Sequence, residues 1–98
     1  MNPNDICYAI MLNKAPGRET TPDMVARHIE HLRQLDDQGK LVLAGPFEDF
    51  PGGMVIVRAD SLESARRIAE SDPFVIEGVR TFEVRTWLLA TRENGYLG

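Results

Sequence analysis

The sequence predicts a single α+β domain with four β-strands and two α-helices in the order β-α-β-β-α-β. Two observations predict this class: four short apolar runs have the length of strands, and two longer segments repeat apolar residues every three or four positions. Glycine and proline residues mark most of the boundaries between these segments. The 98 residues suit one domain, for which we expect a core at 6–90 and a tail at 91–98.

The first half of the chain contains a strand, a helix and a second strand. Residues 6–12 are an apolar run typical of a buried strand. The helix begins after Thr21, a good capping residue, and ends before Gly39, which favours helix termination. Residues 41–44 are the second strand, which Gly45-Pro46 terminates.

The second half contains a hairpin partner, a second helix and a last strand. Residues 54–58 pair with the preceding strand, because a short glycine-rich turn joins the two. The second helix starts at Asp60 or Ser61 and weakens by Asp72, the residue before a proline. Residues 79–90 alternate in polarity and form the last strand. We expect these side chains of the second helix and last strand to face the core: Leu62, Ala65, Ile68, Ala69, Phe82, Val84 and Leu88.

This order of elements is that of the ferredoxin-like fold, a four-stranded antiparallel sheet with two helices on one face. The other face of the sheet has no cover within one chain. Its strands are apolar enough to need one, and two sheets packed face to face would provide it. We therefore expect a homodimer.

The composition excludes several classes of partner. The formal net charge is −4, whereas a nucleic-acid-binding protein needs a basic surface to neutralise phosphates, so we expect neither nucleic acid nor an anionic membrane as a partner. No apolar run approaches the length of a membrane span. The single cysteine, Cys7, cannot form an internal disulfide, and the N-terminus does not resemble a signal peptide. We expect a cytoplasmic protein.

His28 is the anomaly of the first helix. Val25, Ile29 and Leu32 are spaced as one helical face, and His28 falls on the same face. A polar ring directed toward a core must be satisfied by a partner or used in chemistry. His31 lies near the edge of this face and reads as a solvated or dimer-rim histidine. No third ligand stands at a recognisable spacing from the two histidines, so we expect no metal site.

Four short motifs, taken in order, resemble the YCII-related (YciI-like) family. They are His28, Gly39-Lys40-Leu41, Ala44-Gly45-Pro46 and Asp72-Pro73-Phe74. The resemblance implies a ferredoxin-like fold in a dimeric α/β-barrel arrangement and an active site built on His28 and Asp72. Gly45 and Pro46 match the family's Gly-Pro at the end of the second strand. A few relatives act on chlorinated hydroquinones as cofactor-free dehydrochlorinases, and most have no known substrate.

We therefore expect a small enzyme that uses no cofactor, in which Asp72 orients His28 for general acid–base catalysis. The substrate would be a small organic molecule, aromatic compounds included, and the reaction of the lyase, isomerase or dehydrochlorinase type. No nucleophile is evident, because Cys7 lies inside an apolar strand. Asp72 could instead be only a turn residue, and His28 only a structural residue that docks the helix.

A substrate pocket beside this pair would need apolar walls and an anchor for a carboxylate. Arg85 or Arg80 could hold the carboxylate, or could pair with Glu83 instead. The apolar residues among the candidates given below could instead belong to the core or to a dimer interface. Two other functions stay open: a non-catalytic dimeric module that binds a small ligand, and a cofactor-free monooxygenase. The candidate substrate-binding residues are Gly45, Pro46, Phe74, Tyr8, Met54, Trp87 and Arg85.

Overall fold

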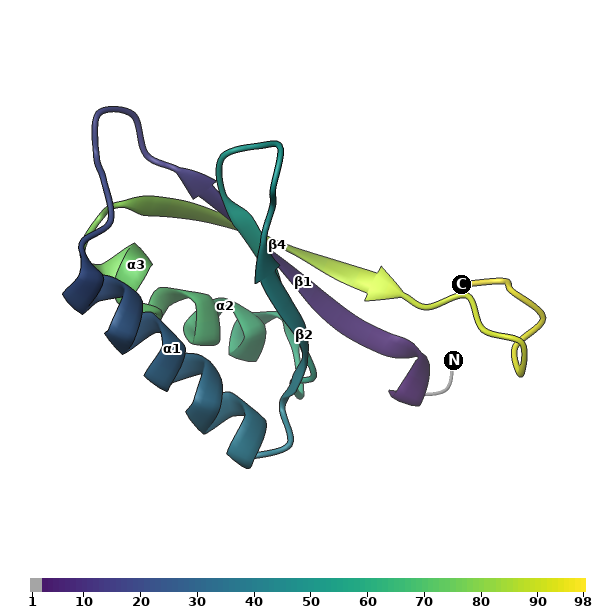
Figure 1. Cartoon of the computed structure of the whole chain (residues 1–98). Coiled ribbons are helices and arrows are strands. Elements are labelled where there is room, and N and C mark those ends of the chain that lie inside the picture. The colour runs from purple at the N-terminus through teal and green to yellow at the C-terminus, as the bar shows by residue number, and fades with distance from the viewer. Residues whose placement is uncertain (1–2) are drawn as a thin grey trace.

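A computed structural model describes residues 3–98 and has seven principal helices and strands after a short 3₁₀ turn at Pro3–Asp5 (Figure 1). Their order, βαββααβ, contains every predicted element and one more helix. The bounds are β1 Ile6–Lys14, α1 Pro22–Asp37, β2 Leu41–Pro46, β3 Gly53–Val57, α2 Leu62–Glu70, α3 Pro73–Ile76 and β4 Arg80–Leu88.

The four strands form one antiparallel sheet in the order β2-β3-β1-β4. The helices lie together on one face of this sheet, below it in Figure 1. This is the ferredoxin-like arrangement that the sequence predicts. The strands β1 and β2 extend two residues beyond their predicted ends, because the paired strands continue to offer hydrogen bonds there.

The core lies between the sheet and the helices. Ile10 pairs with Val55 on one side and Val84 on the other, which places all three side chains on the helix-facing side. From α2, Ala65 and Ala69 are fully covered, and their small size lets the helix approach the sheet closely. The remaining buried members of this core are Tyr8, Leu12, Leu35 and Val57.

Not all of the predicted core positions are buried. Val25 and Ile29 on α1 are 37% and 49% exposed, although their periodicity is that of an apolar face. The expectation for Leu62 and Leu88 was wrong, since they are 41% and 40% exposed. Leu88 pairs with Ile6 where the two long strands run past the helix layer, so no helix covers it (Figure 1).

Side-chain caps fix the beginning of each helix. The Thr21 hydroxyl accepts from the amide of Met24 at 3.2 Å, as the sequence indicates. At α2 the cap is Ser61 rather than Asp60: its hydroxyl accepts from the amide of Ser64 at 3.1 Å. The added helix α3 follows directly from Asp72, because an Asp cap with proline next to it is a strong helix start.

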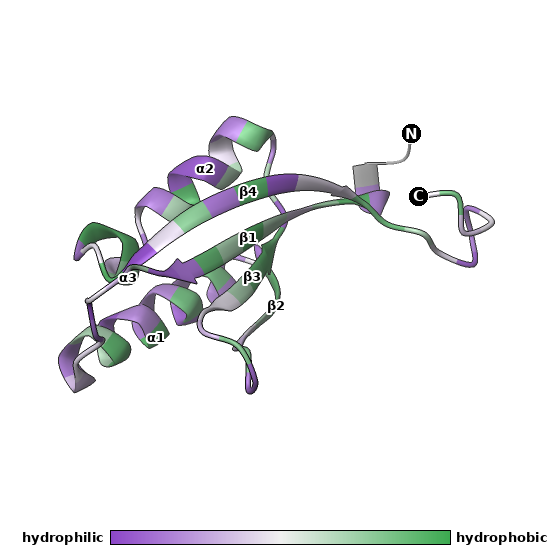
Figure 2. Cartoon of the chain, turned by 90° about the horizontal axis from the view of Figure 1, so that it is seen from above, coloured by the Kyte–Doolittle hydropathy of each residue, from purple (hydrophilic) through white to green (hydrophobic). Residues whose placement is uncertain are grey.

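The sheet face away from the helices has no cover within the described residues. Ile56, Ala9 and Arg85 form one cross-strand row on this face. Figure 2 views the sheet from this side, and green hydrophobic residues follow β1, β3 and β2. Leu43 on β2 is 67% exposed here and Trp87 on β4 is 45% exposed.

The tail after β4 folds back on itself beyond the end of the sheet (Figure 1). The Asn94 side-chain amide donates to the carbonyl of Leu89 at 2.8 Å and to the carboxylate of Asp5 at 3.2 Å. These bonds hold the tail next to the start of β1. Among the described residues, no helix is both long enough and apolar enough to cross a membrane.

Candidate active site

His28 and Asp72 meet beneath the sheet. The His28 Nδ1 atom lies 2.9 Å from both carboxylate oxygens of Asp72. Asp72 is only 2% exposed, and it is the one charged side chain among the buried residues of the described chain. A carboxylate oxygen accepts hydrogen bonds, so the contact assigns the ring proton to Nδ1. The other ring nitrogen, Nε2, has no protein partner in residues 3–98 and is free to accept a proton.

The local structure explains how these two residues come together. His28 lies in the second turn of α1, while Asp72 occupies the junction between α2 and α3. Asp72 Oδ1 also accepts from the backbone amide of Phe74 at 2.9 Å, which caps α3. The turn role and the histidine-partner role of Asp72 are therefore not alternatives, because the same carboxylate fills both.

Phe74 completes the setting of the imidazole. Its ring lies almost parallel to that of His28, with centroids 4.1 Å apart and an interplanar angle of 13°. The Arg80 guanidinium carbon lies 5.4 Å from the centroid of the same phenyl ring. The imidazole is thus held by a hydrogen bond at one edge and by a flat aromatic surface along one face.

A cavity of about 500 Å³ adjoins this pair, between α1 and the β2–β3 end of the sheet. Val25, Ile29 and Leu32 line it from α1, which explains why two of these apolar residues are exposed. Its walls are mostly apolar, and Arg80 is the one Lys or Arg residue among the described residues that line it. The hairpin side of the wall consists of Ala44, Gly45, Pro46, Gly52, Gly53, Met54 and Val55.

The glycines of this wall are needed for close packing. Gly52 adopts a φ of +107°, and a Cβ atom there would overlap the carbonyl oxygen of Leu12. A Cβ on Gly53 would lie 2.7 Å from the carbonyl oxygen of Gly45. The hairpin can therefore fold over the cavity only with glycine at these two positions.

Four of the candidate pocket residues line the cavity: Gly45, Pro46, Met54 and Phe74. Trp87 and Arg85 do not, because their cross-strand partners Cys7 and Ala9 alternate with the core-facing residues of β1. They lie on the uncovered sheet face, and Arg85 is 3.8 Å from Glu83. Tyr8 is buried on the helix side of the sheet, but it does not line the cavity either. It lies four residues along β1 from Leu12, which does line the cavity, and four residues of a strand span about 13 Å.

Arg80, considered beside Arg85 from the sequence, is the arginine that reaches the cavity. It stands at the first position of β4, directly after α3, and its guanidinium donates to the carbonyl of Val79 at 3.0 Å. No described carboxylate forms an ion pair with it. The sequence offers only a weak signal for this choice: Arg80 follows Phe74 by six residues and Arg85 follows it by eleven. The pairing of β4 with β1 decides which face each arginine occupies.

His31 does not line this cavity. Burial lowers the pKa of His31 from the ordinary value of 6.5, the carboxylate of Asp72 partly raises it, and His28 lowers it. It is half-buried rather than solvated. Within residues 3–98 no three His, Cys, Asp or Glu side chains are grouped so as to hold a metal ion.

Fold and geometry together define the class: a ferredoxin-like α+β domain with a buried histidine–aspartate pair at the wall of an apolar cavity. The chain belongs to the YCII-related domain family, whose model matches residues 6–88. It is 40% identical over 82 residues to the uncharacterized protein YjpA of Bacillus subtilis, covering 84% of this chain and 96% of that protein. It is 34% identical over 77 residues to protein YciI of Escherichia coli, covering 68% of this chain and 79% of that protein.

A solved structure has the same fold. It is 5-chloro-2-hydroxyhydroquinone dehydrochlorinase (TftG) from Burkholderia phenoliruptrix, in complex with 2,5-dihydroxybenzoquinone. The TM-score is 0.64, and the match covers 85% of this chain and 94% of that one at 22% sequence identity. At this identity the likeness shows the shared fold.

Proposed function

We propose that this protein is a small acid–base enzyme in which His28 exchanges protons with a small organic substrate and Asp72 orients it. The observation that carries the proposal is the contact of His28 Nδ1 with a buried carboxylate, 2.9 Å away, beside an apolar cavity of about 500 Å³. A histidine that served only to dock α1 would need no cavity next to its ring.

The chemistry follows from the fixed tautomer. With its proton at Nδ1 directed to Asp72, the neutral ring offers Nε2 as a base. When Nε2 takes a proton, the adjacent carboxylate stabilises the imidazolium that forms. The protonated ring can then return the proton to another atom of the substrate or to a leaving group. Isomerisation and elimination both fit this sequence.

The cavity suggests the class of substrate. Its apolar walls suit a flat hydrocarbon ring, and Phe74 offers an aromatic surface. Arg80, with no ion-pair partner among the described residues, suits an anionic oxygen such as a phenolate or carboxylate. A small hydroxylated aromatic or quinone combines these features. The dehydrochlorinase of the same fold, whose complex contains 2,5-dihydroxybenzoquinone, supports this choice.

The proposal includes a homodimer formed through the uncovered sheet face. Leu43 and Trp87 are large apolar side chains that stand exposed on this face, at 67% and 45%. A second copy that presents the same face would cover both, in a two-fold arrangement. The dimer would place the helices and the two His28 cavities on the outside.

Binding and proton transfer can be tested separately. We would titrate the protein with 2,5-dihydroxybenzoquinone and follow ligand absorbance, and then follow exchange of the ligand's ring hydrogens in D₂O by NMR. A His28→Asn variant should abolish enzyme-dependent exchange, whereas His31→Asn, a matched change on the same helix, should retain it. Release of chloride from 5-chloro-2-hydroxyhydroquinone tests the elimination reaction.

The outcomes discriminate between the functions. Binding without exchange or chloride release, in all variants alike, would favour a non-catalytic ligand-binding module. Loss of folding in His28→Asn would favour a structural histidine. Oxygen consumption that exceeds the spontaneous oxidation of this substrate and depends on the protein would point to a monooxygenase instead.

A further inference from the structure

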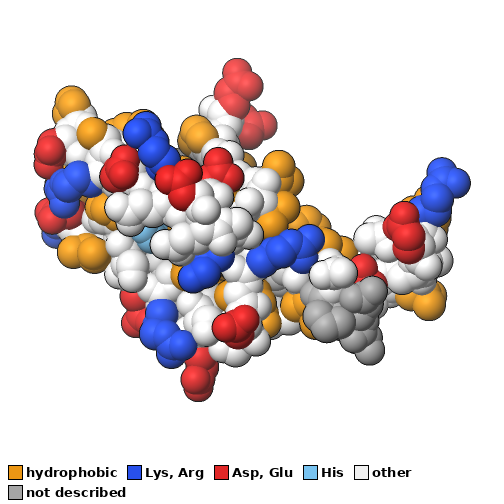
Figure 3. All heavy atoms as spheres, turned by 90° about the horizontal axis from the view of Figure 1, so that it is seen from below, with side chains coloured by type: hydrophobic (Ala, Val, Ile, Leu, Met, Phe, Trp, Pro, Cys, Tyr) orange, Lys and Arg blue, Asp and Glu red, His pale blue; other side chains and the backbone are white. Residues whose placement is uncertain are grey.

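A second cleft lies between α1 and α2 and shares no lining residue with the His28 cavity. Its volume is about 660 Å³. On the helix-bearing face, Figure 3 shows a histidine side chain with Lys and Arg side chains beside it. His31 is the histidine that lines this cleft. The cleft needs an explanation of its own, because the acid–base site does not use it.

The charges of this cleft are unbalanced. Three cations line it, Lys40, Arg58 and Arg67, against the single carboxylate of Asp60. Within the described chain none of these three cations forms an ion pair, while Lys14, Arg27, Arg33 and Arg85 each do. The whole chain is acidic, with a net charge of −4. A local excess of positive charge in an acidic chain favours an anionic occupant.

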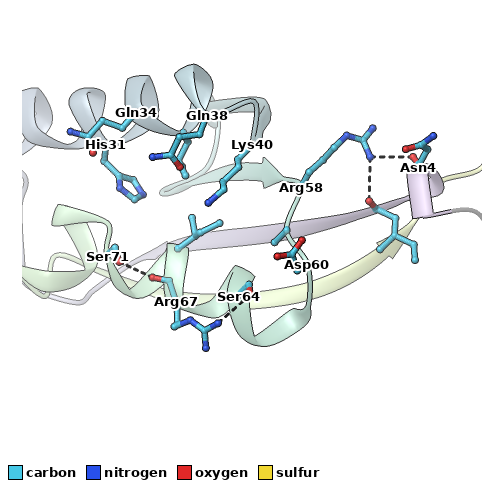
Figure 4. Close-up of a pocket in the computed structure, with 14 residues that line it drawn as sticks. Asn4, His31, Gln34, Gln38, Lys40, Arg58, Asp60, Ser64, Arg67 and Ser71 are labelled. Carbon is cyan, nitrogen blue, oxygen red and sulfur yellow. Dashed lines mark hydrogen bonds between the residues drawn. The ribbon is translucent and has the colours of Figure 1, made fainter.

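The arrangement of the side chains separates an inner group from a rim. In Figure 4, His31 and Lys40 project into the cleft from the α1 side, facing α2. Arg58 is turned aside, and its guanidinium donates to the carbonyl of Asn4 at 3.1 Å. Arg67 lies along α2, with its guanidinium donating to Ser64 at 3.2 Å. The inner donors are therefore an ammonium and an imidazole, with two fixed guanidinium groups at the edge.

The cleft also has polar side chains other than its cations, and these can form hydrogen bonds with a ligand. Gln34 and Gln38 on α1 and Ser71 at the end of α2 add amide and hydroxyl groups, and Asp60 adds an acceptor. Leu35 and Ile68 provide an apolar floor. The volume is far larger than a single oxyanion requires, so the polar groups have room to bind further atoms of the same ligand.

We infer that the cleft between α1 and α2 binds a small, hydroxyl-rich metabolite that carries an oxyanion group, a phosphate or a carboxylate. Lys40 and His31 contact the oxyanion, and Arg58 and Arg67 add favourable charge from the rim. Asp60 and the two glutamines bind hydroxyl groups. The inference is independent of the chemistry proposed for His28.

The test is an NMR titration of ¹⁵N-labelled protein with four probes: ribose 5-phosphate, inorganic phosphate, gluconate and ribose. We expect saturable shifts of the amides of His31, Lys40 and Ser71 with the sugar phosphate or with gluconate, and the arm that saturates first identifies the oxyanion. Lys40→Met should weaken this binding about tenfold, the value expected for one lost charge-assisted hydrogen bond. Lys14→Met, which removes the same charge outside the cleft, should leave it unchanged.

Three results would overturn the inference. One is the absence of shifts at the cleft with both charged sugars. Another is equal binding of neutral ribose, since the charge would then play no part. The third is equal weakening by Lys40→Met and Lys14→Met, which would reduce the effect to overall charge. If Lys40→Met does not fold, Arg67→Met serves the same comparison, because Arg67 lies on the rim of the cleft.

Discussion

The phenyl ring of Phe74 lies against the imidazole of His28, with centroids 4.1 Å apart and planes 13° from parallel. The backbone amide of the same Phe74 donates to Asp72, the partner of that imidazole. One residue therefore contacts both members of the pair, through its ring and through its main chain.

Replacement of Phe74 by leucine tests this dual contact. We expect Phe74→Leu to lose about 1–2 kcal/mol of unfolding free energy and to weaken ligand binding at His28, because the flat support of the imidazole is gone. Urea denaturation and quinone titration measure the two effects. Phe82→Leu is the matched control: Phe82 is partly buried on β4 and does not line the His28 cavity. Equal effects of both variants on binding would contradict a specific role for Phe74.

Two substitutions of Asp72 separate its structural contribution from its charge. Asp72→Ala removes the cap of α3 and the partner of His28, and should cost about 2–4 kcal/mol in urea denaturation. Asp72→Asn keeps the oxygen that caps α3 but buries an NH₂ group beside the Nδ1 proton of His28, and should cost less than Asp72→Ala, about 1–3 kcal/mol. If the proposed chemistry is right, Asp72→Asn should nevertheless slow deuterium exchange about 10²–10⁴-fold. Unchanged exchange in this variant would contradict the orienting role.

The lowered pKa of His31 predicts a pH dependence of stability. Burial is the main cause, opposed by Asp72 and reinforced by His28, and Lys40 and Arg67 also line the same cleft. Below pH 6.5 the unfolded chain protonates this ring while the folded protein still does not, so unfolding takes up a proton. The His31 contribution to stability is therefore present above pH 6.5 and lost as the pH falls toward the folded pKa. Urea midpoints between about pH 5.5 and 7.5 should fall less steeply on acidification in His31→Asn.

A charge on the uncovered sheet face should separate the expected dimer. Leu43→Glu places a carboxylate where a second copy would pack, so light scattering should give a mass near 11.0 kDa in place of twice that value. Ile76→Glu is the control, since Ile76 is 65% exposed on α3, among the helices. A wild-type protein that is monomeric at all accessible concentrations would remove the dimer from the proposal.

The order of the main elements could be predicted because apolar periodicity and turn residues mark each of them. The four-residue helix α3 could not, because one turn is too short to show a period. Periodicity also placed Val25 and Ile29 on an apolar face without showing what covers that face. The structure leaves them partly exposed at a cavity, which a pattern of residue types does not distinguish from a core.

The candidate site could also be predicted only in part from the sequence. His28 was conspicuous from its helical face, but its meeting with Asp72, forty-four positions later, depends on tertiary packing and was indicated only by the family resemblance. The choice between Arg80 and Arg85 depends on strand register. Their separation is odd, so they occupy opposite faces of a regular strand, and only the pairing with β1 shows which face is which.

The cavity has two walls of different construction. His28, Asp72 and Phe74 belong to the helical layer, whereas the opposite wall is the glycine-rich β2–β3 hairpin, whose connecting residues are exposed. Residues 47–51 do not line the cavity themselves, but they join the two strands of this wall, so substitutions there can shift the wall while the proton-transfer groups keep their places. Selectivity and reactivity can therefore diverge independently during evolution. Libraries randomised at residues 47–51, with the helices untouched, would exploit the same separation in the laboratory.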